Sequence, residues 1–383
     1  MDLTESPAEQ AFREELRSWM AANAPAPFDG DTHSLEYVDY LRTWQRTLAQ
    51  GGWLGITWPK EYGGRGQSPV EQTIFLEEMA KAKAPPIIGG VGIGLIGPTI
   101  AMIGTENQKE RFLAKMLLGE EIWAQGFSEP NAGSDLGSLS TRAVRDGDKF
   151  IVNGQKTWTS YAHVSDWIFL LVRTDPEVHK YKGITCLLVD MKSEGVSVRP
   201  LRMMSGDAAF NEVFFSDVRV PVSNVLGEIN GGWNVAITAL MHERANLGGA
   251  AHVMLSQFLA GIVRAARELG VADDPLVRQK IAQAHLGLEV FHMTSSRALS
   301  RVGKGEMPGP EGSILKLFWS DLNQRMVQWA GEILGPYGQL SEGVFEPFSY
   351  NYLRARGNSI EAGTDEVLKN TIAYRVLGLP KSY

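Results

Sequence analysis

Two short polar segments have residue types that suit a flat ligand rich in oxygen and nitrogen. Residues 128–135 read Ser-Glu-Pro-Asn-Ala-Gly-Ser-Asp, and residues 153–160 read Asn-Gly-Gln-Lys-Thr-Trp-Thr-Ser. The Gly-Ser turn at 133–134 can offer backbone N–H groups and a hydroxyl to a phosphate or carbonyl oxygen, and Trp158 places an aromatic face near the Ser160 hydroxyl. Alone, the turn would be a hairpin loop and the tryptophan a core residue. Their pairing predicts two walls of one ligand site.

The single cysteine offers little chemistry. Cys186 lies in a strand-like run, residues 183–189, so we expect a buried, inert thiol. One cysteine excludes an internal disulfide framework and suits a reducing cytosol. We predict no metal site. The glycine-rich run 89–94 does not follow a predicted strand, so we interpret it as a packing feature and not as a dinucleotide-binding fingerprint.

The composition narrows the class of protein. A chain of 383 residues with 44% hydrophobic and 21% charged residues is typical of an ordinary soluble protein with two or three domains. Its net charge of −7, without a cluster of Lys and Arg, argues against a nucleic-acid partner. The acidic start does not resemble a signal peptide, and no apolar run is long enough to span a bilayer. We therefore expect a cytoplasmic protein.

The first third of the chain predicts helices. Start signals, each with an N-cap Ser or Thr followed three positions later by Glu or Gln, stand at 6–9, 68–71 and 105–108. Apolar residues follow each signal at helical spacing. The glycine-rich apolar block 85–104 could be a packed helix or a loop that lines a pocket, and both alternatives stay open. We expect a helical domain over residues 1–121.

The pattern changes twice further along the chain. Short β-branched or aromatic runs separated by turn residues predict a β domain, barrel-like or a sandwich, over residues 122–228, with a hairpin turn at 146–147. Long amphipathic stretches then predict a four-helix-bundle domain over residues 229–383. Because helices, strands and helices follow one another in blocks, without βαβ alternation, we predict an α+β multidomain fold.

The two polar segments closely resemble the flavin-binding signature of the acyl-CoA dehydrogenases. The resemblance covers essentially the whole chain, because this family also has a helical, a β and a helical domain. It implies bound FAD, with Ser128 near the isoalloxazine ring, Ser160 close to flavin N5, and Ser134 also reaching the pantetheine of coenzyme A. The FAD contacts that it implies are Gln125, Phe127, Ser128, Gly133, Ser134, Trp158, Thr159, Ser160, Thr364 and Glu366.

The resemblance also implies a reaction. It is the α,β-dehydrogenation of an acyl-CoA thioester to the trans-2-enoyl-CoA, as in β-oxidation and other lipid catabolism, with electrons passing to an electron-transferring flavoprotein. A carboxylate held close to the substrate α-carbon and away from water would remove a proton, and the β-hydride would pass to flavin N5. An acyl-CoA oxidase on the same scaffold is an alternative. The acyl group cannot be read from the sequence.

Two glutamates compete for the role of base. Glu243 stands on an expected long helix beside Arg244, and this pair resembles the family members whose base and substrate-facing arginine lie there. The alternative is a solvated helix surface, as for most neighbouring charges. Glu361 stands one residue before Ala362, the position that much of the family gives to its base. We rank Glu243 first and Glu361 second.

One feature of the family is missing from the sequence. Relatives usually carry an Arg-x-x-Phe-Gly segment that binds the FAD pyrophosphate of a neighbouring subunit, but residues 265–274 contain no such motif. Glu332 and Pro336 also stand where relatives more often have Gln and Gly. Half of a shared flavin site would then be degraded or supplied by a different chain. The family implies a tetramer built as a dimer of dimers, homomeric or mixed α2β2, and a catalytically reduced partner subunit is our second hypothesis.

Overall fold

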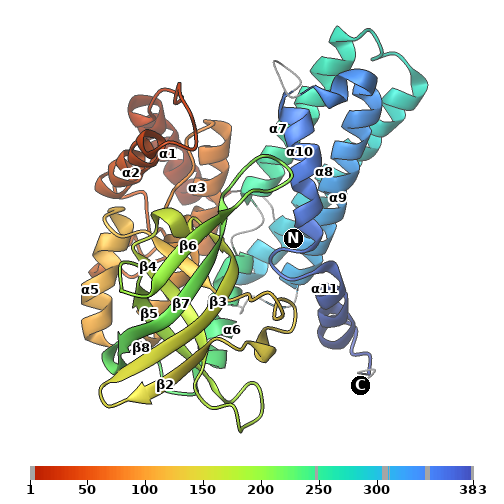
Figure 1. Ribbon diagram of the computed structural model, residues 1–383. Helices are drawn as coiled ribbons and strands as arrows, with labels where there is room; N and C mark the ends of the chain where they lie inside the picture. The colour runs from red at the N-terminus through yellow and green to blue at the C-terminus, as the bar shows by residue number, and fades with distance from the viewer. Residues whose placement is uncertain (1–4, 246–248, 304–308, 310, 341–345, 381–383) are drawn as a thin grey trace. The chain divides into compact units, whose positions relative to one another are not determined.

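The computed structural model describes residues 5–245, 249–303, 309, 311–340 and 346–380. The chain separates into two compact units, drawn in Figure 1. The unit that we call the bundle unit contains residues 1–20, 68–83 and 244–383, and the sheet unit contains residues 21–67 and 84–243. Helix α3 (Pro69–Lys81) therefore belongs with the C-terminal helices, although it lies far from them in sequence.

The described part of the sheet unit contains an eight-stranded mixed sheet, in the order β6-β7-β3-β2-β4-β5-β8 with β1 beside β4 (Figure 1). The pairs β1–β4 and β2–β4 are parallel, and the other neighbouring pairs are antiparallel. The hairpin turn predicted at 146–147 joins β2 to β3 and is confirmed. The strands are β1 (Trp123–Gly126), β2 (Arg142–Asp146), β3 (Lys149–Ser160), β4 (Trp167–Arg173), β5 (Ile184–Asp190), β6 (Val196–Leu201), β7 (Phe210–Pro221) and β8 (Val225–Leu226).

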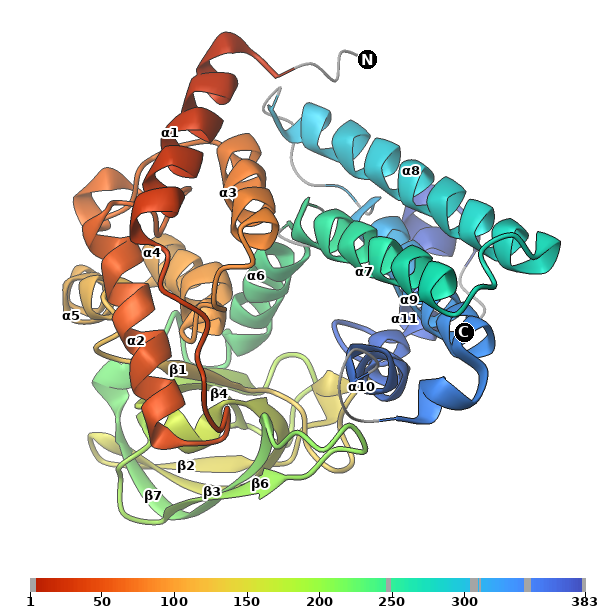
Figure 2. The same cartoon turned by 90° about the horizontal axis from the view of Figure 1, so that it is seen from above.

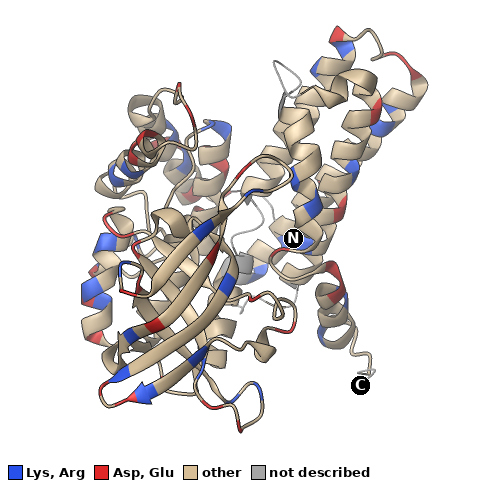
Figure 3. Cartoon of the chain, viewed as in Figure 1, with Lys and Arg blue, Asp and Glu red and all other residues tan. Residues whose placement is uncertain are grey.

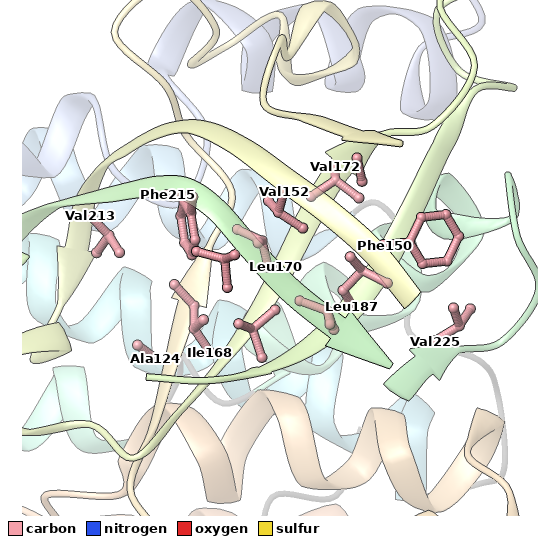
Figure 4. Packing of buried hydrophobic residues seen from close by; sticks show 14 of the residues in the cluster. Ala124, Phe150, Val152, Ile168, Leu170, Val172, Leu187, Val213, Phe215 and Val225 are labelled. Atoms are coloured by element: carbon pink, nitrogen blue, oxygen red, sulfur yellow. The ribbon is translucent and has the colours of Figure 1, made fainter. Parts of the chain in front are cut away.

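Buried hydrophobic side chains fill the interior of this curved sheet (Figure 4). Ile168 and Leu170 point inward from β4, Val152 from β3, and Val213 and Phe215 from β7. Such β-branched and aromatic side chains pack well on a pleated, buried surface, which is why these runs form strands. The core lies under β1, which leads into the polar segment 128–135, and under β3, which contains the polar segment 153–160.

Helices of the sheet unit include α2 (Leu35–Gln50), α4 (Gly97–Ile103), α5 (Glu106–Leu117) and α6 (Gly232–Ala245), the last through residue 243. The block 85–104 is resolved in favour of packed helix, because a π-helical turn over Gly92–Ile96 leads directly into α4. The indole nitrogen of Trp58 donates to the carbonyl oxygen of Ile93 at 3.1 Å. A Cβ atom at Gly97 would lie 2.0 Å from the same indole ring, so only glycine allows this close approach.

The bundle unit combines α1, through residue 20, and α3 with the C-terminal helices. Figure 2 shows α7 and α8 side by side, and Leu255, Leu288, Phe291, Leu322 and Met326 fill the core between α7, α8 and α9. The α+β fold class, with helical, β and helical blocks, is confirmed. The bundle-unit helices are α1 (Pro7–Asn23), α3, α7 (Gly249–Glu268), α8 (Pro275–Gly303), α9 (Glu311–Leu334), α10 (Glu346–Arg354) and α11 (Asp365–Thr371).

The helix starts predicted from the sequence are also confirmed. Helices α1, α3 and α5 begin at Pro7, Pro69 and Glu106, one residue after the N-cap in each case. Capping boxes close the first turns of α3 and α5.

Acidic and basic residues are interspersed along the helices and strands (Figure 3). In the described ranges, no helix combines the length and the apolar character that crossing a membrane requires.

A buried carboxylate links α1 to α3. Glu78 is only 4% exposed and accepts hydrogen bonds from Arg13 Nη1 at 2.6 Å, Lys81 Nζ at 2.9 Å and Arg17 Nε at 3.1 Å. Burial raises the pKa of Glu78, but the hydrogen bonds from these three cations outweigh burial and hold the pKa at about 2. The network fixes the first helix of the chain against α3.

We expect this network to make stability depend on acidic pH. Because the folded pKa of Glu78 is about 2 and its ordinary value is 4.5, the unfolded chain takes up the proton first. The contribution of Glu78 to the free energy of unfolding is therefore fully present above about pH 4.5 and is lost as the pH falls towards about 2. Glu78→Gln should lower the free energy of unfolding by about 1–3 kcal/mol near pH 7, measured as a lower calorimetric midpoint.

Glu14→Gln is the matched control, because the Glu14 side chain is 75% exposed and its Oε1 lies as far as 3.7 Å from Arg17 Nη1, which makes a weak ion pair. It should leave the midpoint nearly unchanged. The difference between wild type and Glu78→Gln should shrink as the pH falls below 4.5. A difference that stays constant down to pH 2.5 would contradict the role of this carboxylate.

Candidate functional site

The two polar segments that the sequence pairs lie side by side in the sheet unit. Residues 128–135 follow closely after β1, and residues 153–160 form the last part of β3. The backbone N–H of Thr157 donates to the carbonyl oxygen of Ser128, with 2.9 Å between nitrogen and oxygen. The juxtaposition predicted from the sequence is therefore present in the structure.

A buried ion pair lies between the same segments. Lys156 has no exposed surface, and its Nζ donates to Glu129 Oε1 at 2.7 Å and to the carbonyl oxygen of Phe127 at 3.0 Å. Glu129 Oε2 accepts from the backbone N–H of Ser140 at 2.7 Å and from its hydroxyl at 2.8 Å, while Oε1 accepts from the backbone N–H of Thr141 at 2.9 Å. The pair thus connects three stretches of the chain.

Both members of the pair carry their charge at neutral pH. Burial raises the pKa of Glu129, but Lys156 and the donors at 140–141 outweigh burial and hold the pKa at about 2. Burial lowers the pKa of Lys156 to about 8, which is still above neutrality. Sequence reasoning did not select these two residues, although both stand inside the segments that it singled out.

Strand β3 departs from regular geometry where it reaches the aromatic residue. The register against β7 shifts between Lys156 and Thr159, and Trp158 has a φ of +58°. A non-glycine residue in this left-handed region is strained, and such strain often marks a functional site. The Trp158 side chain is 59% exposed, and its ring meets Phe210 edge to face at 5.9 Å. The bulge therefore presents a large aromatic surface outside the core.

The next two residues supply hydroxyl groups. Thr159 is buried, and its Oγ1 has no hydrogen-bond partner within the described part of the chain. Its carbonyl oxygen accepts from Asn211 Nδ2 at 3.0 Å, and Ser160 is half-buried. Buried polar groups are normally satisfied. An exposed indole beside a hydroxyl that lacks a partner is consistent with a wall that a polar, flat ligand completes.

The other residues predicted for this wall come from β1 and the turn that follows. Gln125 lies in β1 and is half-buried, and the buried Phe127 has its ring 5.7 Å from the ring of Phe169. Ser128 is half-buried, whereas the Gly-Ser turn at 133–134 is exposed. Apart from the chain neighbours of Gly133, no described residue has an atom within 4 Å of the place that a Cβ of Gly133 would occupy. The turn is therefore open to an incoming group.

A cationic cavity of about 600 Å³ lies beside this turn. Arg173 donates to the carbonyl oxygens of Gly137 at 2.5 Å and Lys180 at 2.7 Å, and so holds two loops together. Lys180 Nζ in turn contacts Asp135 Oδ1 at 2.7 Å. The lining includes Ser138, Ser140, Arg142, Arg173, Glu177 and Lys180.

The two candidate bases lie in different settings. Glu243 and Arg244 belong to α6, but their side chains lie outside the described residues. Glu361 is described, and both of its carboxylate oxygens are engaged. Glu361 Oε2 accepts from Arg354 Nη2 at 2.7 Å, and Oε1 accepts from Asn358 Nδ2 at 2.6 Å. These contacts fix the direction in which the Glu361 carboxylate points.

The residues after Glu361 form a turn fixed to α9. Ala362 has a φ of +53°, and buried Lys316 donates from Nζ to the carbonyl oxygen of Gly363 at 2.8 Å. The Thr364 hydroxyl caps α11 by accepting from the N–H of Val367 at 3.3 Å. Backbone hydrogen bonding in the first turn of α11 lowers the pKa of Glu366. Sequence reasoning also missed Lys316, whose role depends on a contact between distant segments.

The predicted site residues are thus divided between the two units. Residues 125–160 of the predicted set come together in the sheet unit, whereas Glu361, Thr364 and Glu366 belong to the bundle unit. Searched over the described ranges, the chain shows no group of three His, Cys, Asp or Glu residues that could hold a metal ion.

The Glu361 contacts give a test of its structural role. Glu361→Gln should lower the free energy of unfolding by about 1–2 kcal/mol, because Arg354 loses a charged acceptor. A double-mutant cycle with Arg354→Met, followed by calorimetry, should return a coupling energy of about 0.5–3 kcal/mol. If Glu361→Gln costs as much in the Arg354→Met background as in wild type, the pair is not coupled.

Comparison with known proteins covers the whole of this architecture. Models of the acyl-CoA dehydrogenase N-terminal, middle and C-terminal domains match residues 6–120, 124–218 and 230–377. Acyl-CoA dehydrogenase IpdE1 of Mycobacterium tuberculosis is 37% identical over 380 residues, which are 97% of this chain and 98% of that relative. Acyl-CoA dehydrogenase FadE26 of the same organism is 34% identical, with 100% of both chains covered.

Solved structures resemble the chain over the same extent. The Tcur3481-Tcur3483 steroid ACAD is 34% identical with a TM-score of 0.88, and 100% of each chain is covered. The ChsE4-ChsE5 complex from Mycobacterium tuberculosis is 33% identical with a TM-score of 0.83, again with 100% of each chain covered. The names of both structures join two components.

Proposed function

The chain belongs to the acyl-CoA dehydrogenase family, and we propose that it catalyses FAD-dependent α,β-dehydrogenation of an acyl-CoA thioester to the trans-2-enoyl-CoA. Members of the family are flavoprotein oxidoreductases of lipid catabolism, and this chain is an oxidoreductase of that family. The observation that carries the finer proposal is the wall of the sheet unit, where two hydrogen-bonded segments place an exposed indole on strained backbone next to a buried hydroxyl that lacks a partner in the described part of the chain.

The residues of this wall fit a flavin. Trp158 offers an aromatic face, Ser128 and Ser160 offer hydroxyls, and the backbone N–H groups at 133–134 offer donors for phosphate. When bound, FAD supplies a ring that accepts the substrate β-hydride. The residues that we propose to hold it are Gln125, Phe127, Ser128, Gly133, Ser134, Trp158, Thr159, Ser160, Thr364 and Glu366.

We propose Glu243 as the base that removes the α-proton, with Arg244 and Ser134 on the thioester side. The choice is supported by the contacts of its rival, because Glu361 gives both carboxylate oxygens to Arg354 and Asn358. A base for a carbon acid needs a carboxylate that is free to approach the carbon and is raised in pKa by a dry site. The carboxylate of Glu361 is held by these two contacts and is not free to approach a substrate carbon.

The cationic cavity is our proposed contact for the phosphorylated end of coenzyme A. An acyl-CoA carries several phosphate charges, which suit a site with Arg142, Arg173 and Lys180 in its lining. The cavity lies next to the turn that contains Ser134, since Lys180 pairs with Asp135. One substrate could therefore reach from this cavity to the flavin wall.

The base assignment is tested by anaerobic reduction of the flavin. Purified holoenzyme is mixed with linear, branched, cyclic and steroid-derived acyl-CoA thioesters, and the flavin absorbance is followed by stopped flow. We expect at least one thioester to bleach the flavin. Glu243→Gln should slow bleaching by about 10²–10⁴-fold, because an amide cannot accept the α-proton, whereas Glu361→Gln should slow it little. Unimpaired bleaching by Glu243→Gln would reject this base.

The same experiment separates the alternatives. A chain that is colourless when purified alone and takes up no FAD would favour a partner subunit in a mixed α2β2 assembly, as the two-component names of its structural relatives suggest for this chain. Rapid re-oxidation by air with release of peroxide would favour an oxidase.

We propose an electron-transferring flavoprotein as the electron acceptor. We also propose a dimer of dimers as the assembly and a cytoplasmic location. We also propose domains at 1–121, 122–228 and 229–383.

The cavity assignment is tested with Arg142→Ala. Removing this exposed cation should raise KM for the acyl-CoA by about tenfold, leave kcat unchanged, and weaken the dependence of KM on salt. Steady-state kinetics with the corresponding acyl-pantetheine, which lacks the phosphates, should show no such change. Arg145→Ala on the same strand is the control, because Arg145 is absent from the cavity lining. An equal loss with both thioesters would count against phosphate binding.

A further inference from the structure

The buried pair of Lys156 and Glu129 stands where the two parts of the proposed flavin wall meet. Lys156 holds the carbonyl oxygen of Phe127, one residue before Ser128, and it precedes Trp158 by two residues. Glu129 directly follows Ser128 and closes its own loop by accepting from the backbone at 140–141. Displacement of either charge would therefore change the spacing between Ser128 and Trp158.

Stability alone does not account for such a pair. Taking two charges out of water costs several kcal/mol per ion, and replacing a buried pair by apolar residues of similar volume is often neutral or stabilising. A charged pair, unlike apolar side chains, makes hydrogen bonds that depend on orientation. Because these short hydrogen bonds reach specific backbone atoms, they fix the position of one segment relative to the other. Apolar side chains would fill the same space without fixing these backbone atoms.

The adjacent strain makes such fixing necessary. Trp158 keeps a φ of +58° in a bulge of β3, and strained backbone persists only where surrounding contacts determine it. On one side, the backbone N–H of Tyr161 donates to the carbonyl oxygen of Ala209 at 2.8 Å. On the other side, Lys156 and the N–H of Thr157 hold the strand to Phe127 and Ser128. The indole lies between these two anchors.

We propose that Lys156 and Glu129 are positioning residues of the flavin wall. Both side chains are buried and act through the backbone that they hold; their charge pair sets the distance between the Ser128 hydroxyl and the indole of Trp158, so that FAD meets a preformed site. This inference rests on the proposed function, because it concerns binding of FAD. It predicts that a variant without the pair still folds cooperatively but binds FAD with lower affinity.

The test uses the double variant Lys156→Met with Glu129→Gln, which removes both charges and leaves no charge unpaired. FAD affinity of the apoprotein is measured by flavin fluorescence titration, and the bound flavin is examined by visible circular dichroism. Hydrogen exchange of the Thr157 and Tyr161 amides is followed without FAD. We expect a cooperatively folded variant that binds FAD about tenfold or more weakly, with an altered flavin dichroism and faster exchange at both amides.

Glu78→Gln is the control, because it removes a buried charge in the bundle unit. It should lower the thermal midpoint without changing the FAD dissociation constant or the exchange of the two amides. If the double variant binds FAD as wild type does, with the same dichroism, the pair is only structural and the proposal is wrong. If the double variant does not fold, Glu129→Asp decides by the same readouts, because it keeps both charges of the buried pair and changes only the reach of the carboxylate.

Failure of the proposed function is recognisable in the same titration. A wild-type chain that takes up no FAD removes the basis of both proposals. A wild-type chain that binds FAD and is bleached by an acyl-CoA, together with a double variant of unchanged affinity and unchanged amide exchange, rejects only the positioning role.

Discussion

A lysine without exposed surface determines much of the geometry of the sheet unit. An ammonium group can stay charged in the interior only where acceptors surround it, and the chain supplies the Glu129 carboxylate and the Phe127 carbonyl to Lys156. The carboxylate is satisfied in turn by the backbone at 140–141. One charge pair therefore locates the end of β1, the closure of the loop that follows it, and the middle of β3. The two motifs of the proposed flavin wall lie on either side of that pair.

The exposed indole shows what this rigidity is for. Trp158 combines a side chain that is 59% exposed with a left-handed backbone, and its ring meets the edge of Phe210; backbone strain of this kind is often stored at functional sites. A site that is completed by its ligand accounts for both observations. The free energy lost in the unliganded wall would be recovered when a flat ring covers the indole.

Local signals were predictable from the sequence, and long-range pairings were not. The starts of α1, α3 and α5 depend on capping residues within one turn, so their positions follow from the sequence. The juxtaposition of residues 128–135 with 153–160 was predicted because the two segments, taken as a pair, indicate two walls of one ligand site, whereas each segment alone indicates only a loop or a core residue. The Lys156 to Glu129 pair depends on how β1 and β3 meet, and the packing of 85–104 depends on Trp58, which no local pattern reveals. The same holds for α3, which Glu78 ties to α1.

The turn before α11 is fixed by contacts with α9 and with residues earlier in the chain. Lys316 holds the carbonyl oxygen of Gly363, Ser320 holds the Asp365 carboxylate, and Arg354 holds Glu361. These contacts fix the turn and occupy the side chains of Glu361 and Asp365, while Ala362 between them has no carboxylate to offer. A turn built in this way can still present the Thr364 end of α11 to a ligand, but it does not release a carboxylate for proton abstraction. The contacts of this turn support our proposal that the base lies on another helix, at Glu243 of α6.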